Sequence, residues 1–269
     1  MNGERVHDSP MMMSDAIAVG SAERVLADPT TPWWAEHCSR YAYAARHVSG
    51  ARVLDVASGA GFGARMLADA GASYTVGCDL SPEALRQSRA DFGRPGLTFV
   101  PADATMLPFL DHAFDVVVSF ETLEHLVERD RFITELHRVL KPRGTLFLST
   151  PNYAITRAYA RNPFHLHEYM RDELADVLQR TFDDVTLYGQ DLSARYRVAP
   201  FLPGHDAPRS AFDRVRLLTW KVCNRLPFAI REFVSSALLG RSFYPSSADY
   251  VFGADFSRAH VLLAVCRRS

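Results

Sequence analysis

The chain has 269 residues, of which 48% are hydrophobic and 23% charged, and its formal net charge at pH 7 is −1. This composition is typical of a folded protein with one full core, and the near-zero charge excludes a global attraction to nucleic acid. No run of 18 apolar residues occurs, and no basic segment precedes an apolar one at the start, so we expect a cytoplasmic protein. Four scattered cysteines predict reduced thiols: Cys38, Cys78, Cys223 and Cys266.

The predicted elements alternate between strands and helices along the chain. A helix over 33–48 comes first, then strands near 52–56, 74–78, 97–100, 114–119 and 145–150, separated by helices near 62–70, 82–91 and 129–139. A helix over 172–180, a strand over 184–190 and a strand over 260–268 follow. The alternation predicts an α/β fold with right-handed crossovers and helices on both faces of a parallel sheet.

Three regions divide the chain. We expect a partly disordered arm over 1–32, a core over 33–190 with 259–269, and a helical insertion or cap over 191–258. Within the insertion, 211–239 predicts helices with apolar side chains available for burial: Phe212, Val215, Leu218, Trp220 and Phe233. Basic residues outnumber acidic ones there, which leaves two interpretations. The region is a cap with a solvated basic face, or it is a platform for an anionic or lipid-linked acceptor and rests on a membrane surface.

A glycine-rich turn follows the first predicted strand. In RVLDVASGAGFG (52–63) the strand ends with Asp55, and Gly59, Gly61 and Gly63 follow at alternate positions. Glycine permits positive φ and lets backbone N–H groups approach a ligand with no Cβ in the way. The next strand ends in Asp79, about 24 residues later, near the spacing at which a carboxylate binds ribose hydroxyls. We therefore predict a nucleoside-bearing ligand. A nicotinamide dinucleotide is the alternative, although Asp55 would repel its pyrophosphate.

The same pattern resembles motif I of the class I S-adenosylmethionine-dependent methyltransferases, usually D-x-G-x-G-x-G. Ala57 stands here in place of the first glycine, and we expect it to adopt an ordinary φ. The resemblance continues in order through 98–109, 114–126 and 140–152. It implies a Rossmann-like sheet of seven strands, mostly parallel with the last strand antiparallel, and S-adenosylmethionine as the cofactor. The cofactor-binding residues it implies are Arg40, Tyr41, Asp55, Ala57, Gly59, Gly61, Asp79, Leu80, Asp103, Ala104 and Phe120.

The resemblance also implies roles for some of these residues. Asp79 would bind the ribose, Leu80 would cover one face of the adenine, and Asp103 and Ala104 would lie at its edge. We expect Arg40 to meet the methionine carboxylate and Tyr41 to flank the sulfonium. The aromatic stripe of the 33–48 helix is equally consistent with ordinary core packing.

One candidate chemical group follows the fourth strand. Glu121, Glu124 and His125 are spaced i, i+3 and i+4, which places them on one helix face. Two carboxylates and an imidazole suit Mg²⁺ or another divalent cation, which would lower the pKa of an acceptor hydroxyl. The run resembles the E-x-x-E-H segment of the ubiquinone-biosynthesis O-methyltransferases, whose positions are linked to a metal. The alternative is that Glu121 hydrogen-bonds within the cofactor site and His125 caps the helix or packs.

A second group lies in 149–170, where the chain crosses the carboxyl edge of the predicted sheet. Its N-P-F-H-x-x-E-Y run and the D-V-x-x-x-G-Q segment ending at Gln190 resemble methyltransferases of polysaccharide and secondary-metabolite pathways. His165 is our preferred general base and His167 the second choice, because imidazole titrates near neutrality. His125 completes the candidate catalytic set. The alternative is that one histidine, with Pro163 and Phe164, only fixes the loop.

These observations predict a methyltransferase that acts on a hydroxyl of a sugar, glycan or secondary metabolite, with a histidine base or a divalent metal. Methyl transfer to nitrogen or carbon of a small molecule is one alternative, and a non-catalytic S-adenosylmethionine-binding protein is another. No N-P-P-Y-like motif occurs, and we expect no nucleic-acid partner. A homodimer is possible.

Overall fold

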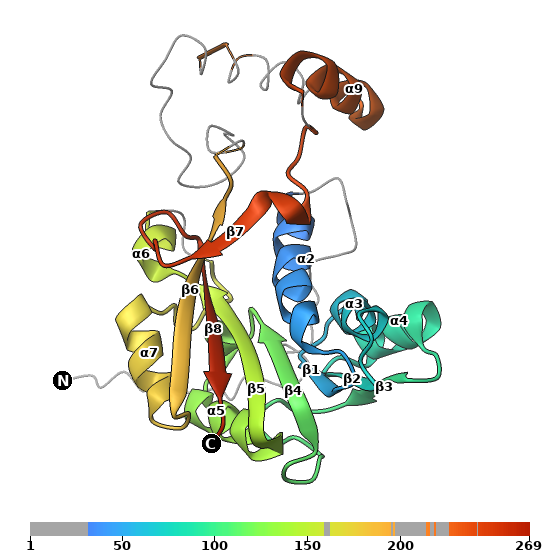
Figure 1. Ribbon diagram of the computed structural model, residues 1–269, viewed down its shortest axis with the longest axis vertical. Coiled ribbons are helices and arrows are strands. Elements are labelled where there is room, and N and C mark those ends of the chain that lie inside the picture. The colour runs from blue at the N-terminus through green and yellow to red at the C-terminus, as the bar shows by residue number, and fades with distance from the viewer. Residues whose placement is uncertain are drawn as a thin grey trace, which may run out of the picture.

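A sheet of eight strands runs through the part of the chain that the computed structural model describes (Figure 1). The described residues are 32–158, 162–194, 196, 214, 215, 218, 226–240 and 242–269. The strands are β1 (Arg52–Val56), β2 (Tyr74–Asp79), β3 (Leu97–Pro101), β4 (Phe114–Phe120), β5 (Leu140–Pro151), β6 (Asp184–Leu192), β7 (Tyr250–Gly253) and β8 (Val261–Arg267). Their order across the sheet is β3-β2-β1-β4-β5-β8-β6-β7.

The strand directions confirm the predicted fold class. Neighbouring strands from β3 to β5 are parallel, β8 runs antiparallel between β5 and β6, and β7 pairs antiparallel with β6. The expected count of seven strands is wrong, because β7 adds an eighth at the edge from within the region expected to be a helical insertion. This strand has only 4 residues, which is too short for alternation to reveal it in the sequence.

Helices fill the connections close to where the sequence places them. They are α2 (Pro32–Ala44), α3 (Phe62–Asp69), α4 (Pro82–Phe92), α5 (Arg129–Val139), α6 (Tyr153–Thr156), α7 (Arg171–Gln179) and α9 (Phe228–Leu239), with short 3₁₀ turns η1 (Ala45–His47), η2 (Leu123–His125) and η3 (Ser247–Asp249). The helix predicted over 33–48 corresponds to α2 and η1. Residues 1–31 of the predicted arm lie outside the described residues.

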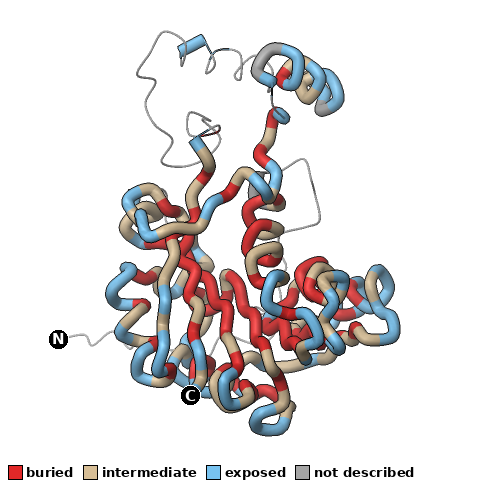
Figure 2. Tube along the Cα trace, viewed as in Figure 1, coloured by how far each residue is buried: buried red, intermediate tan, exposed pale blue. Residues whose placement is uncertain are grey.

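The two faces of the sheet are buried by different helices, because successive side chains of a strand point to opposite sides. Leu54 and Val117 join a core cluster that contains Phe132 and Leu136 of α5 and Leu174 and Leu178 of α7. Val53, Val116 and Val118 join a second cluster, with Tyr41 and Ala44 of α2 and Phe62 and Leu67 of α3. Figure 2 shows the buried residues concentrated in the strands between these helices. The near-continuous apolar strands therefore follow from coverage on both sides.

In the region over 191–258, several apolar side chains that the sequence offers for burial lie on the surface. Val215, Leu218 and Phe233 are exposed, and so is Ile230 on α9, which stands away from the sheet in Figure 1. Phe212 and Trp220 lie outside the described residues. Among the described helices, none is long and apolar enough to cross a bilayer. Cys38, Cys78 and Cys266 carry free thiols, as predicted, while Cys223 is not described.

Candidate functional site

The turn between β1 and α3 is built from left-handed backbone. Gly59 has φ 52°, Gly61 has φ 81°, and Ala57 has φ 58°. The expectation of an ordinary φ at Ala57 is wrong: the turn imposes the left-handed region even though this residue has a Cβ. An L-residue in that region carries a steric penalty of roughly 1–2 kcal/mol, which explains why a glycine usually stands there. Such strain is tolerated where the surrounding structure fixes a functional turn.

The strand-end carboxylate of Asp79 is fixed beside this turn. Its Oδ2 accepts a hydrogen bond from the Gly59 N–H at 2.8 Å, and its Oδ1 accepts one from the Ser81 N–H at 2.8 Å. The structure therefore brings Gly59 and Asp79 together, and their binding of a ribose stays a prediction. The neighbouring Leu80 is exposed, which leaves its apolar side chain available to a ring.

Residues after β3 complete this end of the sheet. Asp103 Oδ1 accepts hydrogen bonds from the backbone N–H and the hydroxyl of Thr105, both at 2.8 Å, and so orders the loop that contains Ala104. Met106 forms a bridge with Asp103 and is exposed. Met106 was not among the predicted residues, because in the sequence it is only one apolar residue of a loop, two positions after Ala104.

Tyr41 of α2 lies over the start of α3 and over β1. Its hydroxyl donates to Asp55 Oδ1 at 3.1 Å, and its ring meets Phe62 and Phe120 edge-on, with centroids 5.5 and 4.9 Å away. Gly63 permits this approach, because a Cβ there would lie 1.9 Å from Tyr41 Cζ. Burial raises the pKa of Asp55 to about 8; the hydrogen bond from Tyr41 opposes this shift and the charge of Asp79 adds to it. Tyr41 and Phe120 therefore form one buried aromatic wall at the end of β1 and β4.

Arg40 is fully buried between α2 and β6. Its Nη1 donates to Gln190 Oε1 at 2.7 Å, and the Gln190 amide in turn donates to the carbonyl of Glu36 and to Ser39 Oγ. Nη2 of Arg40 lies 4.0 Å from Glu121 Oε1, while its Nε and Nη2 have no hydrogen-bond partner among the described residues. The Gln190 contact therefore fixes α2 to the sheet and holds a cation behind Glu121.

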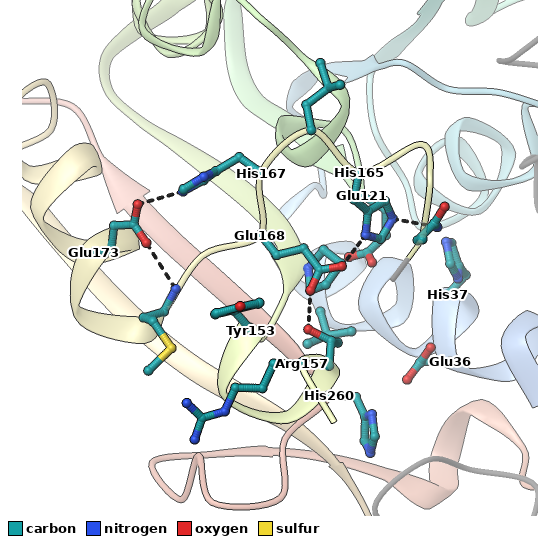
Figure 3. A pocket seen from close by; sticks show the side chains of 16 residues that line it. Glu36, His37, Glu121, Tyr153, Arg157, His165, His167, Glu168, Glu173 and His260 are labelled. Atoms are coloured by element: carbon teal, nitrogen blue, oxygen red, sulfur yellow. Dashed lines mark hydrogen bonds and ion pairs between the residues drawn. The ribbon is translucent and has the colours of Figure 1, made fainter. Parts of the chain in front are cut away.

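A cavity of about 770 Å³ opens at the carboxyl edge of the sheet, beside Glu121. Its walls come from α2, the ends of β4 and β5, α6, the 162–170 loop, α7 and the start of β8. The lining residues are Glu36, His37, Glu121, Pro151, Tyr153, Thr156, Arg157, Asn162, His165, Leu166, His167, Glu168, Met170, Glu173, His260 and Val261. Figure 3 shows Glu121, His165 and Glu168 together near its centre, with Glu36 and His37 on one side.

His165 is held by polar contacts to both ring nitrogens. Nδ1 lies 2.5 Å from Glu168 Oε1, and Nε2 lies 3.0 Å from Asn162 Nδ2. Because a carboxylate only accepts hydrogen bonds and an amide nitrogen only donates, this arrangement assigns the proton to Nδ1 and the lone pair to Nε2. Glu168 is itself anchored by the hydroxyl of Thr156. The loop thus presents an imidazole with an oriented basic nitrogen in the cavity wall.

The other predicted loop residues lie apart from this pair. His167 contacts Glu173 of α7, with Nε2 2.6 Å from Oε1, and both side chains are more than a third exposed. Tyr169 is buried, and its ring meets the His167 ring edge-on, so it belongs to the core rather than to the cavity wall. His260, at the opposite wall, was missed, since nothing in the sequence near the last strand points to it.

The segment after β4 does not form the helix face that its spacing suggests. Glu121 has φ 53°, and only the single 3₁₀ turn η2 follows. Glu121 accepts a hydrogen bond from Ser149 Oγ at 2.6 Å and lines the cavity, but it is not a member of the group formed by Glu124, His125 and His165. Those three offer ligand atoms within 4.8 Å of one another. The structure therefore replaces Glu121 by His165 in the group that is able to hold a metal.

Glu124 and His125 also shape the loop. The Glu124 carbonyl accepts the N–H groups of Leu166 and His167, and its carboxylate accepts the Thr150 hydroxyl at 2.9 Å. Nδ1 of His125 donates to the Phe164 carbonyl at 3.0 Å, and its ring meets the His165 ring edge-on. Burial, and then the charge of Glu121, raises the pKa of Glu124 well above its usual value. Glu124 and His125 therefore hold the loop that contains His165 in place.

The fold and the family of this chain are supported by comparisons with known proteins. A family model for a methyltransferase domain matches residues 54–148. A probable S-adenosylmethionine-dependent methyltransferase of Mycobacterium tuberculosis is 32% identical over 196 residues, which cover 68% of this chain and 70% of that protein. The chain belongs to the S-adenosylmethionine-dependent methyltransferases. The predicted enzyme class and methyl donor are therefore confirmed.

Other relatives of this methyltransferase match over shorter stretches. A probable S-adenosylmethionine-dependent methyltransferase of Mycolicibacterium smegmatis is 33% identical over 150 residues, covering 55% of this chain and 57% of that protein. A fatty-acid O-methyltransferase of the same organism is 43% identical over 128 residues, covering 44% and 46%. A solved Thermotoga maritima structure, titled a possible histamine N-methyltransferase, has a TM-score of 0.57 and 12% identity over 88% of this chain and 91% of its own. That likeness shows the shared fold.

The turn after β1 fits the donor of this methyltransferase family. A Cβ at Gly59 would meet nothing within 4 Å, so the backbone there borders open space beside the Asp79 carboxylate. A glycine backbone next to a strand-end carboxylate supplies the hydrogen-bonding groups that bind a nucleoside.

Proposed function

We propose that this methyltransferase transfers a methyl group to a hydroxyl oxygen of a sugar or secondary metabolite, with His165 as general base. The observation that carries the proposal is the contact between His165 Nδ1 and Glu168 Oε1, in the wall of a cavity at the carboxyl edge of the sheet. A carboxylate that holds Nδ1–H orients the imidazole and stabilises the cation that forms when Nε2 takes a proton. The cavity volume of about 770 Å³ suits a small-molecule acceptor.

The donor site proposed beside this cavity consists of the predicted cofactor residues. Asp79 would hold the ribose hydroxyls, and Leu80 and Met106 would cover the adenine, with Asp103 and Ala104 at its edge. Tyr41, which contacts Asp55 and Phe120, would flank the sulfonium. Arg40 would meet the methionine carboxylate from its position behind Glu121. The donor, when bound, supplies an activated methyl group. The chain's own task is to align the acceptor oxygen and exclude water.

In this proposal the residues of the loop move one proton. The acceptor hydroxyl takes the place of the Asn162 amide at His165 Nε2 and passes its proton to that nitrogen. Glu168 holds Nδ1–H throughout and balances the positive charge on the ring. His125 and Glu124 keep the loop against the end of β5. General base catalysis of this kind contributes about 10²- to 10⁴-fold to a rate.

The test is a pair of variants on one loop, His165→Ala and His167→Ala, assayed with labelled S-adenosylmethionine and a panel of glycosides and phenols. We expect the first to lose about 10²- to 10⁴-fold in kcat and the second to stay within a few-fold, because His167 contacts Glu173 instead of the Glu168 pair. Binding of S-adenosylhomocysteine, measured by calorimetry, should be the same in both. Full turnover in both variants would remove the histidine base from the proposal.

A metal-assisted reaction is the second candidate, and the grouping of Glu124, His125 and His165 favours it. Here the residues would hold a divalent cation, which would polarise the acceptor hydroxyl. Assays with and without a chelator decide between the two. A rate that is unchanged by chelation supports the base alone, and a rate restored by added Mg²⁺ supports the metal.

Relatives leave the acceptor open to two further classes. The similarity to a fatty-acid O-methyltransferase makes a carboxyl oxygen the competing acceptor, and the possible histamine N-methyltransferase among the structures makes an amine another. A base that removes a proton is of use to a hydroxyl, whereas an ionised carboxyl has no proton to lose.

A further inference from the structure

The acceptor cavity is lined by an excess of acidic side chains. Four glutamates face it, against a single arginine, Arg157, and four histidines. The glutamates come from four separate elements: Glu36 from α2, Glu121 from the end of β4, Glu168 from the 162–170 loop and Glu173 from α7. Charges in a partly enclosed cavity interact through a lower effective dielectric constant than charges in water. An anion that entered would therefore be repelled from several sides.

The positive charges near the cavity offset this field only in part, because Arg157 is the one arginine in the lining. Arg40 is fully buried, its Nη2 lies 4.0 Å from Glu121 Oε1, and it is not among the residues that line the cavity, so its guanidinium faces the acids from behind. His165 and His167 are each already in contact with a glutamate. Burial raises the pKa of Glu36 to about 7; Arg40 opposes this shift and Glu121 adds to it, so the Glu36 carboxyl is fully ionised only above neutral pH.

The chemistry of the loop points in the same direction. A hydroxyl has a proton that must leave as the oxygen attacks, and His165 is placed to receive it. A carboxylic acid with an ordinary pKa near 4 is already ionised at neutral pH, so it needs no base and would bring a charge among four glutamates. The negative field of the glutamates and the position of the base therefore both favour a hydroxyl oxygen over a carboxylate oxygen.

We propose that the cavity is specific for an uncharged hydroxyl compound, a neutral sugar, alcohol or phenol, and rejects acceptors that present a carboxylate. This rests on the proposed function and names its substrate class. In the reaction the acceptor oxygen forms the new bond to the methyl carbon as the carbon–sulfur bond of the donor breaks. Sulfur keeps that electron pair and becomes a neutral thioether, and the hydroxyl proton passes to His165 Nε2. The apolar side chains of Tyr153, Leu166 and Met170 would contact the carbon skeleton of the acceptor.

Matched acceptor pairs test the proposal. Each pair shares a skeleton and differs in one group: methyl glucoside and methyl glucuronide, dodecanol and dodecanoate, benzyl alcohol and benzoate. With the full chain and labelled S-adenosylmethionine, we expect kcat/KM for the hydroxyl member to exceed that of the acid by at least about 100-fold, which corresponds to about 2.7 kcal/mol of discrimination. Equal or faster transfer to the acid members overturns the proposal and leaves methyl transfer to oxygen intact. Transfer to no oxygen of any pair overturns the proposed function itself.

A charge-neutral variant then locates the discrimination. At pH 9 a carboxyl with a pKa of about 7 is ionised, and Glu36→Gln then removes a charge while it keeps the shape of a side chain in the cavity wall. The ratio of hydroxyl to acid kcat/KM at that pH should fall by about 10-fold. Glu83→Gln, the same change on the exposed surface of α4, should leave the ratio unchanged. An unchanged ratio in Glu36→Gln contradicts the role of the field, because the ratio cancels any general loss of activity or folding.

Discussion

Substitution of Gly63 by alanine is predicted to destabilise the protein through Tyr41. A Cβ on Gly63 lies 1.9 Å from Cζ and 2.2 Å from Cε1 of Tyr41, whereas carbon atoms in contact are ~3.5–4.0 Å apart. The ring has to move by roughly 1.5 Å or more. It has little space for this, since it is 5% exposed and meets Phe62 and Phe120.

The magnitude follows from three contributions. Overpacking of a buried ring costs about 1–3 kcal/mol. Loss of the hydrogen bond from Tyr41 to the buried Asp55 costs about 1–3 kcal/mol more, and the better helix propensity of alanine returns up to about 1 kcal/mol. The net loss is about 3 kcal/mol, which lowers the melting temperature of a chain of this size by roughly 6–12 °C.

Thermal unfolding of purified Gly63→Ala measures this loss. Gly253→Ala is the matched control, because a Cβ there meets nothing within 4 Å and its backbone is not left-handed. The effect of Gly63→Ala should also shrink in a Tyr41→Ala background, where the ring is gone. Two results would refute this explanation: a melting temperature of Gly63→Ala equal to that of Gly253→Ala, or a loss of stability from Gly63→Ala that is the same with and without the Tyr41 ring.

Three further outcomes follow from the buried and exposed groups. Burial raises the pKa of Asp55 from 3.8 to about 8, so the native state binds protons more tightly and stability falls as the pH rises between these values. Asp55→Asn removes this dependence. In urea unfolding, the free energy of unfolding of the variant relative to that of the wild type should rise between pH 5 and pH 8, by up to about 1.4 kcal/mol per pH unit. The same difference between variant and wild type at both pH values contradicts this. Gln190→Leu leaves the buried Arg40 without its acceptor and should cost about 3 kcal/mol in urea unfolding, whereas Gln87→Leu on the surface of α4 should be near neutral. If the predicted membrane contact of 211–239 is correct, flotation with phosphatidylglycerol vesicles should require the exposed Ile230 and Phe233 and weaken in Ile230→Ser/Phe233→Ser; binding that is indifferent to both substitutions argues against it.

Much of the sheet was predictable because its signals are local. The apolar runs that become β1 and β4 are buried on both faces, and Asp55 and Asp79 stand at the ends of their strands, where any ligand of a parallel sheet would meet them. The glycines at alternate positions after β1 also predicted a tight turn, because the chain has to turn at the end of such a strand. These features depend on neighbouring residues and so can be read from the chain.

The departures come from contacts between distant residues. The spacing of Glu121 and His125 fits a helix, but the chain after β4 turns with a left-handed residue, and Glu121 finds Ser149 on β5 instead. His165 is part of the group with Glu124 only because its loop folds back over η2. Ala57 is left-handed because the turn around it demands that backbone, against the preference of its own side chain. No pattern along the sequence carries this information.

The place of β8 in the sheet has a consequence for how the protein is made. This strand joins β5 to β6, yet it is translated after both of them and after β7. Until β8 has been translated, β5 and β6 have no partner between them, and each presents unpaired peptide groups along one border. Such borders attract other extended chains. The nascent polypeptide is therefore most vulnerable to aggregation after β6 has been translated and before β8 has, and the addition of a single seven-residue strand closes the gap.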